Sequence, residues 1–465
     1  MRGEIFMTYD FVALDRSSTV PLYQQLYENI SSAIESGNLP QGTKLPSIRR
    51  FSEDLGLSRT TVEGAYQQLC VEGYIVSRPQ SGYYVHLDII VAAKHKNIKN
   101  PPKLNRKTAD NIIYNLSSDS IDSETADIKL WRSYIKDVLK KQSVIVSYGE
   151  PQGETELRRA IAFYSYTVRG VSCSENNIVI GAGTQPLLYL LCGLMREYGT
   201  NTAIEQGGFS KAERVFDDCG FHTAYVSGNM DGININELYN QKIKILFVNP
   251  SGNLITGQPM KMNKRYELLY WAEQCGGIII EDDYNGELRF TSRPIPALQG
   301  MDSDRVVYMG SFSKLLLPSV RIGYMVLPPC LAEIYQKKSS FYNQTASKIE
   351  QLALARYIHD GRLDKQLRRL RKTYAEKSIV LNEALKKAFG SSAKITLHEN
   401  SLSTTLVLEN NGKDIEAAAF RRGLKVTHIK TETENEYALR LGFAGIPMSD
   451  IESAVEMLKQ IINET

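Results

Sequence analysis

The chain has 465 residues, of which 42% are hydrophobic and 23% charged, as in folded proteins with several domains and ample core. A formal net charge of +3 is too small to indicate nucleic-acid binding by itself, so any DNA site must be local. Six cysteines without a close pair give no zinc or disulfide pattern, and no apolar run reaches the ~20 residues that span a bilayer. Residues 1–5 also lack the pattern of a signal peptide. We therefore expect a cytoplasmic protein with no metal site and no membrane partner.

Residues 1–86 are predicted to form three short helices and a hairpin. Apolar residues recur at helical spacing over about 21–37, 45–56 and 58–69. Alternating residues on either side of a turn over 74–85 indicate a β-hairpin. Residues 1–85 hold seven Lys/Arg and nine Asp/Glu, a net charge of −2. A DNA-binding module of this composition must concentrate its cations on one face, and dimerise or borrow charge from elsewhere.

Four pieces of this segment carry a resemblance to a known DNA-binding module. They are Leu45–Arg49, Leu57–Val62, Glu72–Ile75 and Gly82–Val85. In this order and spacing they resemble the winged helix-turn-helix of the GntR type. The resemblance implies that DNA is contacted by five residues, namely Arg49, Arg59, Thr60, Thr61 and Gly82.

Residues 87–113 are predicted to be a basic flexible linker. The stretch from His86 to Asp110 has six Lys/Arg against two Asp, a net charge of +4, together with the pair Pro101–Pro102. It is either a plain solubilising tether or a tether whose lysines also touch DNA phosphates.

Residues 114–465 alternate short apolar runs with helical stretches. The predicted strands are 177–180, 202–204, 223–226, 243–248, 277–280 and 306–309. Such alternation predicts a largely parallel α/β sheet, whose ligands bind at the carboxyl ends of the strands.

Three polar motifs follow predicted strands of this sheet. Lys314 stands between serines in the stretch Gly310–Gly323, which suits a lysine that holds an aldehyde cofactor as a Schiff base. The glycine turn Gly181–Gln185 opens a helix, so its backbone N–H groups form a cradle for phosphate. The acidic stretch Glu281–Tyr284 ends a strand, where a buried carboxylate needs a cation such as a protonated pyridine nitrogen.

Taken in order, these pieces resemble the fold-type-I aminotransferases, which bind pyridoxal 5'-phosphate (PLP). The match extends from about Tyr148 to Phe443, and with the GntR-type head it resembles the MocR/GabR family of transcription regulators. The implied fold is multidomain. A winged helix-turn-helix (1–86) is joined through the linker to an α/β PLP-dependent transferase domain of fold type I (114–465), with a large parallel-sheet domain and a smaller C-terminal α+β subdomain.

The resemblance also implies roles for individual residues. Lys314 is the Schiff-base lysine, Asp282 is the partner of the pyridine nitrogen, and Phe209 stacks on the ring. Tyr284 and Asn253 would contact the ring oxygen, and Tyr148 would reach across a dimer interface to the neighbouring cofactor. The phosphate would be held by Gly183, Thr184, Ser311, Ser313 and Arg321.

Effector recognition is expected at two cations. Arg440 corresponds to the arginine that grips the carboxylate of an amino acid, for which its planar fork suits it. Lys211 stands where the GABA-responsive member has a second carboxylate-binding arginine, so GABA is not a clear effector. The loop 249–257 also departs from the family, because Ile255 precedes Thr256 where relatives have Pro-Thr-Gly, which leaves the register of Asn253 open.

The leading interpretation is a homodimeric, PLP-dependent DNA-binding regulator that senses an amino compound, or PLP itself, through Lys314. A genuine aminotransferase with an accessory N-terminal domain is the alternative, because all groups for Schiff-base chemistry are present. A third interpretation is a DNA-binding protein whose large domain is a cofactor-free scaffold.

Overall fold

The structure, a computed structural model, divides into two compact units, Met1–Arg106 and Lys107–Thr465, which are described separately. It describes residues 9–86, 112–117, 122, 125, 127–206, 209–229, 232–252, 258–283, 285–291, 295–398, 402–410, 412, 414–429 and 435–464. The predicted linker therefore lies almost wholly outside the described residues. No described helix is long and apolar enough to cross a membrane.

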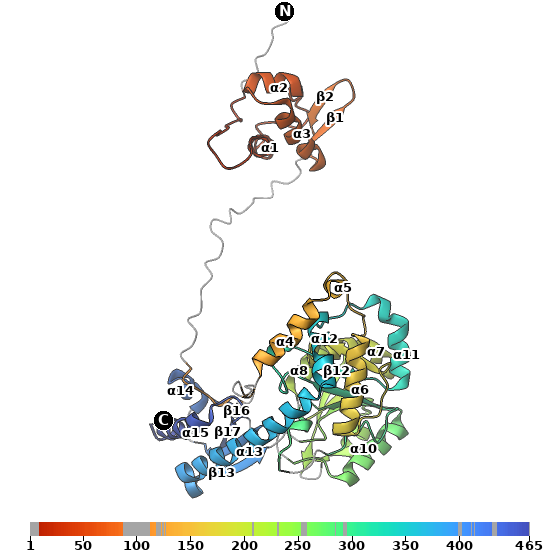
Figure 1. Cartoon of the computed structure of the whole chain (residues 1–465), viewed down its shortest axis with the longest axis vertical. Helices are drawn as coiled ribbons and strands as arrows, with labels where there is room; N and C mark the ends of the chain where they lie inside the picture. Colours follow the sequence, from red (N-terminus) through yellow and green to blue (C-terminus); the bar gives the residue numbers. More distant parts are fainter. Residues whose placement is uncertain are drawn as a thin grey trace, which may run out of the picture. The chain divides into compact units, whose positions relative to one another are not determined.

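The N-terminal unit, called the head below, is built from three helices and a hairpin (Figure 1). They are α1 (Leu22–Glu35), α2 (Ile48–Leu55), α3 (Arg59–Val71), β1 (Ile75–Arg78) and β2 (Gly82–Val85). All five elements were predicted from the sequence. The side chain of Ser58 accepts a hydrogen bond from the backbone of Thr61 and so begins α3, whereas Gly56 ends α2 in the left-handed conformation.

A seven-stranded sheet organises the large unit. Its strands are β4 (Ile178–Gly181), β5 (Asn201–Glu205), β6 (His222–Val226), β9 (Ile245–Val248), β10 (Ile278–Asp282), β11 (Val306–Ser311) and β12 (Gly323–Val326). Their order is β4-β12-β11-β10-β9-β5-β6. The sheet is largely parallel, as predicted, but β12 was not predicted and runs antiparallel to both β11 and β4.

Helices cover both faces of this sheet, so most of its strands are buried on both sides, whereas β6 at one edge is partly exposed. Val179 packs into one hydrophobic cluster with α7 (Thr184–Leu194) and α8 (Ser210–Asp218), whereas Ile178 and Ile180 belong to the cluster that contains α6 (Thr155–Arg169). A third cluster packs α10 (Met262–Cys275) against the sheet. This explains why the strands read as continuous apolar runs rather than alternating ones.

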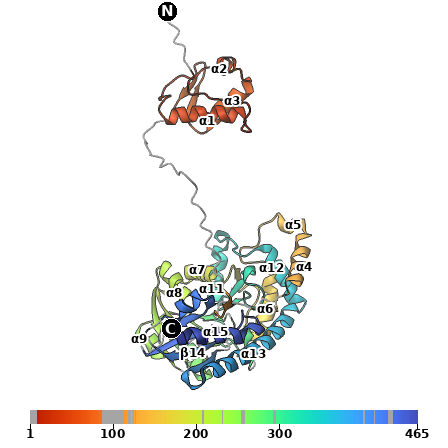
Figure 2. The same ribbon diagram turned by 90° about the vertical axis from the view of Figure 1, so that its left-hand side faces the viewer.

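A smaller α+β subdomain follows, as the resemblance implied. Its antiparallel sheet has the order β13-β14-β17-β16, and the long helix α13 packs beside α15 (Figure 2). The bounds are α13 (Arg362–Phe389), β13 (Lys394–His398), β14 (Ser403–Glu409), α14 (Ile415–Arg421), β16 (Thr427–Ile429), β17 (Glu436–Gly442) and α15 (Ile451–Glu464).

The remaining elements border these two parts. They are β3 (Tyr114–Asn115), α4 (Ile128–Leu139), α5 (Gln142–Ile145), β7 (Gly228–Asn229), β8 (Gly232–Ile233), α9 (Ile235–Asn240), α11 (Pro329–Lys338), α12 (Lys348–His359) and β15 (Leu424–Lys425). Strand β3 pairs with β15 and so ties the start of the large unit to its C-terminal subdomain.

Candidate functional site

Strand register brings two of the predicted motifs, the stretch around Lys314 and the glycine turn, to one edge of the large sheet. Ser311 of β11 pairs with Gly323 of β12, and Gly323 pairs in turn with Gly181 of β4. Lys314 lies half-buried in the turn that follows β11. About 130 residues of sequence separate the glycine turn from Lys314 and its serines. The three strands nevertheless make them neighbours.

The turn between β4 and α7 is shaped to hold an anion. Gly183 lies just before α7, at φ 97° and ψ −178°, a conformation that is essentially restricted to glycine. The guanidinium of Arg321 rests against this turn, and its Nη2 donates to the carbonyl of Ala182 at 3.4 Å. A Cβ added to Gly183 would lie 2.8 Å from that Nη2. Arginine and the N-terminus of α7 together provide positive potential at this point.

Two serines lie at the end of β11 and in the turn that follows it. The backbone N–H of Ser313 donates to Ser311 Oγ at 3.3 Å. The Oγ of Ser313 is buried and has no hydrogen-bond partner among the described residues. A buried hydroxyl without a partner is costly, so a bound acceptor such as a phosphate oxygen would complete its bonding.

Asp282 ends β10, next to β11, with 3% of its surface exposed. Burial, followed by the neighbouring charge of Asp283, raises the pKa of Asp282 from its ordinary value of 3.8 to about 7, while Lys314 acts in the opposite direction. The effect of Lys314 shows that the ammonium and the carboxyl are close enough to interact. Without a further cation the Asp282 carboxylate is poorly stabilised in this dry environment.

A buried ion pair behind Asp282 was not predicted from the sequence. Arg169, at the end of α6, donates from Nε to Asp283 Oδ2 at 2.6 Å and from Nη2 to Ser251 Oγ at 2.5 Å. The hydroxyl of Tyr308 donates to the same Asp283 oxygen at 2.8 Å. Although burial opposes its charge, Asp283 holds the pKa of Arg169 above its ordinary value. One guanidinium therefore joins α6 to the loops that follow β9 and β10.

A second buried arginine fixes the loop after β9. The guanidinium of Arg265 donates to the backbone carbonyls of Pro250 at 2.8 Å, Pro296 at 2.7 Å and Met260 at 3.1 Å. Neither this arginine nor Arg169 carries a local sequence signal, because each lies in a helix that also has exposed positions, where an arginine is ordinarily expected.

The other predicted cofactor residues lie in different surroundings. Phe209 lies half-buried at the start of α8, with its ring stacked on Phe247 at a centroid distance of 6.5 Å. Tyr148 is fully exposed. Asn253 and Tyr284 lie outside the described residues, so their predicted roles stay predictions. Thr184 is the first residue of α7, as its expected contact with phosphate requires.

The two predicted effector cations lie on different elements. Arg440 belongs to β17 of the C-terminal sheet, where it faces Thr405 across the strand pair, and Lys211 is exposed on α8. His398 donates or accepts a hydrogen bond with Thr405 at 2.8 Å. Burial, and then the charge of Arg440, lowers the pKa of His398 to about 4, so a neutral imidazole lies beside the arginine at physiological pH.

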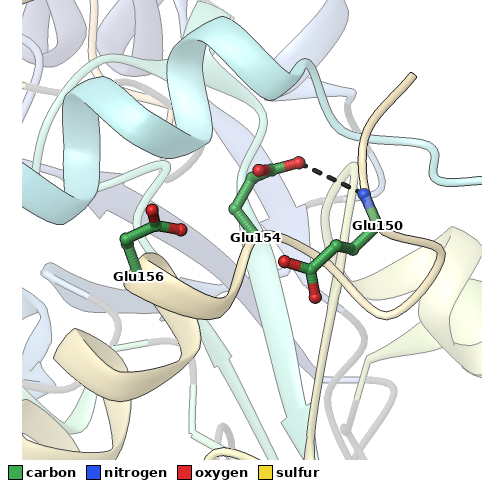
Figure 3. Close-up of side chains that lie close together, drawn as sticks. All are labelled: Glu150, Glu154 and Glu156. Atoms are coloured by element: carbon green, nitrogen blue, oxygen red, sulfur yellow. Dashed lines mark hydrogen bonds between the residues drawn. The ribbon is translucent and has the colours of Figure 1, made fainter. Parts of the chain in front are cut away.

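An acidic cluster at the start of α6 has an ordinary structural explanation. Glu150, Glu154 and Glu156 lie together, and Glu154 accepts a hydrogen bond from the backbone of Glu150 (Figure 3). The Glu150 carboxylate is already bound by Arg158 at 2.8 Å and by Thr155 at 2.9 Å. We assign no metal to these groups.

In the head, the residues predicted to contact DNA lie on α2, α3 and β2. Arg59, Thr60 and Thr61 form the first turn of α3, and the side chains of both threonines are within 2.8 Å of Ser58 Oγ. Arg49 is exposed on α2, where it pairs with Glu53 at 3.1 Å. Gly82, at φ 108°, begins β2 of the wing.

Comparison with known proteins places the two units in one family. Residues 22–85 match the model for bacterial regulatory proteins of the gntR family. Over 96% of its length the chain is 35% identical to the uncharacterized HTH-type transcriptional regulator YdeL of Bacillus subtilis, covering 98% of that protein. It is 30% identical to the probable rhizopine catabolism regulatory protein MocR of Rhizobium meliloti, over 96% of this chain and 95% of the relative.

The large unit is similar to solved aminotransferases. It matches the kynurenine aminotransferase of Pyrococcus horikoshii with a TM-score of 0.65 at 24% identity, over 77% of this chain and 92% of that one. At that identity the likeness establishes the fold, whereas the regulators match both units and favour regulation over enzymatic transamination. The chain therefore belongs to the MocR-type family of GntR transcription regulators, in which a winged helix-turn-helix is joined to an aminotransferase-like domain.

Proposed function

We propose that this regulator binds PLP covalently at Lys314 and changes its DNA binding when an amino compound competes for the cofactor. The observation that carries the proposal is the grouping of an amine, a buried acid and an anion cradle at one sheet edge. When bound, PLP supplies an aldehyde that condenses reversibly with primary amines. The aldehyde, the pyridine nitrogen and the phosphate of PLP match, in this order, Lys314, Asp282 and the cradle formed by Gly183 and Arg321. The match is one of charge and of hydrogen-bonding capacity.

Each group on the chain has a distinct task in this proposal. Lys314 provides the amine. Because its side chain is half-buried and interacts with the Asp282 carboxyl, its position is restricted. Asp282 accepts a hydrogen bond from the pyridine nitrogen and stabilises the positive charge there. Gly183, Thr184, Ser311, Ser313 and Arg321 bind the phosphate. Arg321 fixes its orientation, because a guanidinium binds two phosphate oxygens at once.

The effector is proposed to be an amino compound that carries an acidic group. Arg440 binds that acidic group, with Lys211 as a second cation, while the effector amine displaces Lys314. The response reaches DNA only if the effector binds the two arrangements of the protein with different affinities. We further propose a cytoplasmic homodimer, in which the exposed Tyr148 reaches the cofactor of the partner and the two heads bind repeated DNA half-sites.

Borohydride trapping tests the covalent step. Purified protein is incubated with PLP, reduced, digested and analysed by mass spectrometry. Lys314→Ala is the variant, and Lys337→Ala, at an exposed lysine on α11, is the matched control. We expect the pyridoxyl mass on the peptide that contains Lys314 in the wild type and the control only. An unlabelled Lys314 peptide in the wild type would refute the proposal.

Two further measurements separate sensing from enzymatic turnover. Gel shifts on the upstream DNA of the gene, with and without PLP and candidate amines, are expected to change with the amine in the wild type and not in Lys314→Ala. Product formation from an amino donor and a 2-oxoacid is expected to stop after about one turnover. Many rapid turnovers would favour the aminotransferase alternative instead.

A further inference from the structure

A segment before α1 extends the DNA-binding head beyond its matched family region. We call residues 9–20 the strap; the match to the GntR model begins only at residue 22. The ring of Tyr9 packs on Phe51 of α2 at a centroid distance of 5.0 Å, and its hydroxyl donates to Asp54 Oδ2 at 2.7 Å. The start of the strap is therefore anchored on the first helix of the helix-turn-helix.

The middle of the strap is fixed by two side chains of α1. Asn29 accepts from the backbone N–H of Ala13 at 3.2 Å and donates to the carbonyl of the same residue at 3.0 Å. Gln25 makes the same pair of bonds with Asp15, at 2.8 and 3.0 Å. Since residues 25 and 29 are one turn apart on α1, they hold the strap in register along one face of the helix.

This anchoring places Arg16 against the turn of the helix-turn-helix. Its Nη2 donates to the carbonyl of Gly56 at 2.8 Å, two residues before the Ser58 cap of α3. The side chain is exposed, and its remaining N–H donors make no hydrogen bond or ion pair with any described residue. The adjacent Asp15 carboxylate is bound to Ser17 instead, at 2.8 and 2.5 Å.

The charge distribution of the head sets Arg16 apart from its other arginines. Residues 1–85 have a net charge of −2, and α1 has two glutamates and no lysine or arginine. The other described cations lie on α2, on α3 and in or beside the wing. Lys44 and Arg78 flank the ring of Tyr84 in the wing, whereas Arg49 and Arg50 of α2 each pair with an acid four residues later. Arg16 is exposed at the same helix-turn-helix and has no acidic partner among the described residues.

We propose that Arg16 is a DNA phosphate contact and that the strap is part of the DNA interface. In a helix-turn-helix the second helix enters the major groove while the first crosses the backbone, so the turn between them lies beside phosphates. The bond to Gly56 uses one of five guanidinium donors, which leaves a fork that can bind phosphate oxygens. Such a contact positions the head on the duplex without reading sequence. The inference rests on DNA binding by the head.

Salt dependence of DNA binding tests the contact directly. Fluorescence anisotropy measures the affinity of the full-length protein for the DNA upstream of its gene and for a random duplex. Repeating it at several salt concentrations gives the slope of log affinity against log salt concentration. We expect Arg16→Gln to lower the affinity for both duplexes and to reduce the magnitude of the slope by about 0.9 for each Arg16 that contacts a phosphate. Arg16→Lys keeps the positive charge and is expected to retain most of the slope. Arg368→Gln, at an exposed position on α13, is the matched control and is expected to change neither value.

Two outcomes would overturn the inference. An unchanged slope with lower affinity would mean that Arg16 acts only by holding Gly56, and a lower melting temperature of the head would accompany that result. Unchanged affinity and slope would remove Arg16 from the interface altogether. Arg59→Gln separates the loss of the Arg16 proposal from a failure of DNA binding by the head. A reduced slope for Arg59→Gln would show that the head binds DNA through α3.

Discussion

Replacing Asp282 by Asn is expected to change how the stability of the cofactor-free protein depends on pH. The folded chain keeps Asp282 protonated up to about pH 7, because burial and Asp283 raise the pKa of Asp282. The unfolded chain releases that proton near the ordinary value of 3.8. Between these values the folded state binds more protons than the unfolded state, so stability falls as the pH rises. Asparagine does not titrate and removes this contribution.

The expected magnitude follows from the two pKa values. The step from 3.8 to about 7 corresponds to about 4 kcal/mol when fully developed, since one pH unit is worth about 1.4 kcal/mol. Between pH 4.5 and pH 8 the free energy of unfolding of the wild type should therefore fall by about 3 kcal/mol relative to Asp282→Asn. Glu281 and Glu287, whose pKa values burial also raises to about 7, titrate in both proteins and cancel in the difference.

Urea unfolding followed by tryptophan fluorescence measures this difference. Both tryptophans of the chain, Trp131 and Trp271, lie in the large unit, so the signal reports that unit even in the full-length protein. Asp217→Asn, at an exposed position on α8, is the control and should follow the wild type at every pH. A gap between wild type and Asp282→Asn that is the same at pH 4.5 and pH 8 would refute the reasoning from burial.

Three other substitutions have expected outcomes. Arg169→Leu leaves a buried carboxylate without its cation and should cost about 3–5 kcal/mol in urea unfolding, whereas Arg159→Leu, at an exposed pair, should cost less than about 1 kcal/mol; equal costs would contradict the assignment. Gly183→Ala should weaken PLP binding by about 1–3 kcal/mol in a titration, because alanine is strained at this backbone conformation. The control Gly193→Ala, in α7, has room for its Cβ and should bind PLP as the wild type does. Ser58→Ala should lower the melting temperature of the head and its DNA affinity through loss of a helix cap worth about 1 kcal/mol, and an unchanged melting temperature would refute that role.

Local patterns predicted the elements but not the contacts between them. The helices of the head follow from apolar spacing and from serine caps such as Ser58, both of which are encoded within a few residues. Strand β12 was missed although it is as short and as buried as β4 and β9; unlike them it begins with a glycine, Gly323, a residue that is depleted in strands. Its position between β4 and β11 is what brings the phosphate cradle beside Lys314.

The buried network behind Asp282 was beyond sequence reasoning for a different reason. Arg169 and Asp283 are 114 positions apart, and neither is distinguishable locally from a surface residue. The sequence did single out the acidic stretch 281–284, since carboxylates at the end of an apolar strand need partners. It supplied no means of deciding which cation each carboxylate receives: Asp283 pairs with Arg169, and Glu281 accepts two backbone N–H groups at 3.0 Å.

That division of partners bears on how a cofactor would act as a signal. Asp283 has a dedicated arginine, whereas Asp282 has only the opposing influence of Lys314, and its pKa stays raised. A pyridinium nitrogen would supply the missing positive charge, so binding would stabilise the folded large unit by mass action in addition to occupying the site. If an amino effector takes the place of Lys314 on the cofactor, Lys314 is released as a free amine beside Asp282, and the electrostatic balance at β10 changes again. The same buried carboxyl would thus respond both to the cofactor and to the effector, which is the property that a sensor needs and a rigid scaffold lacks.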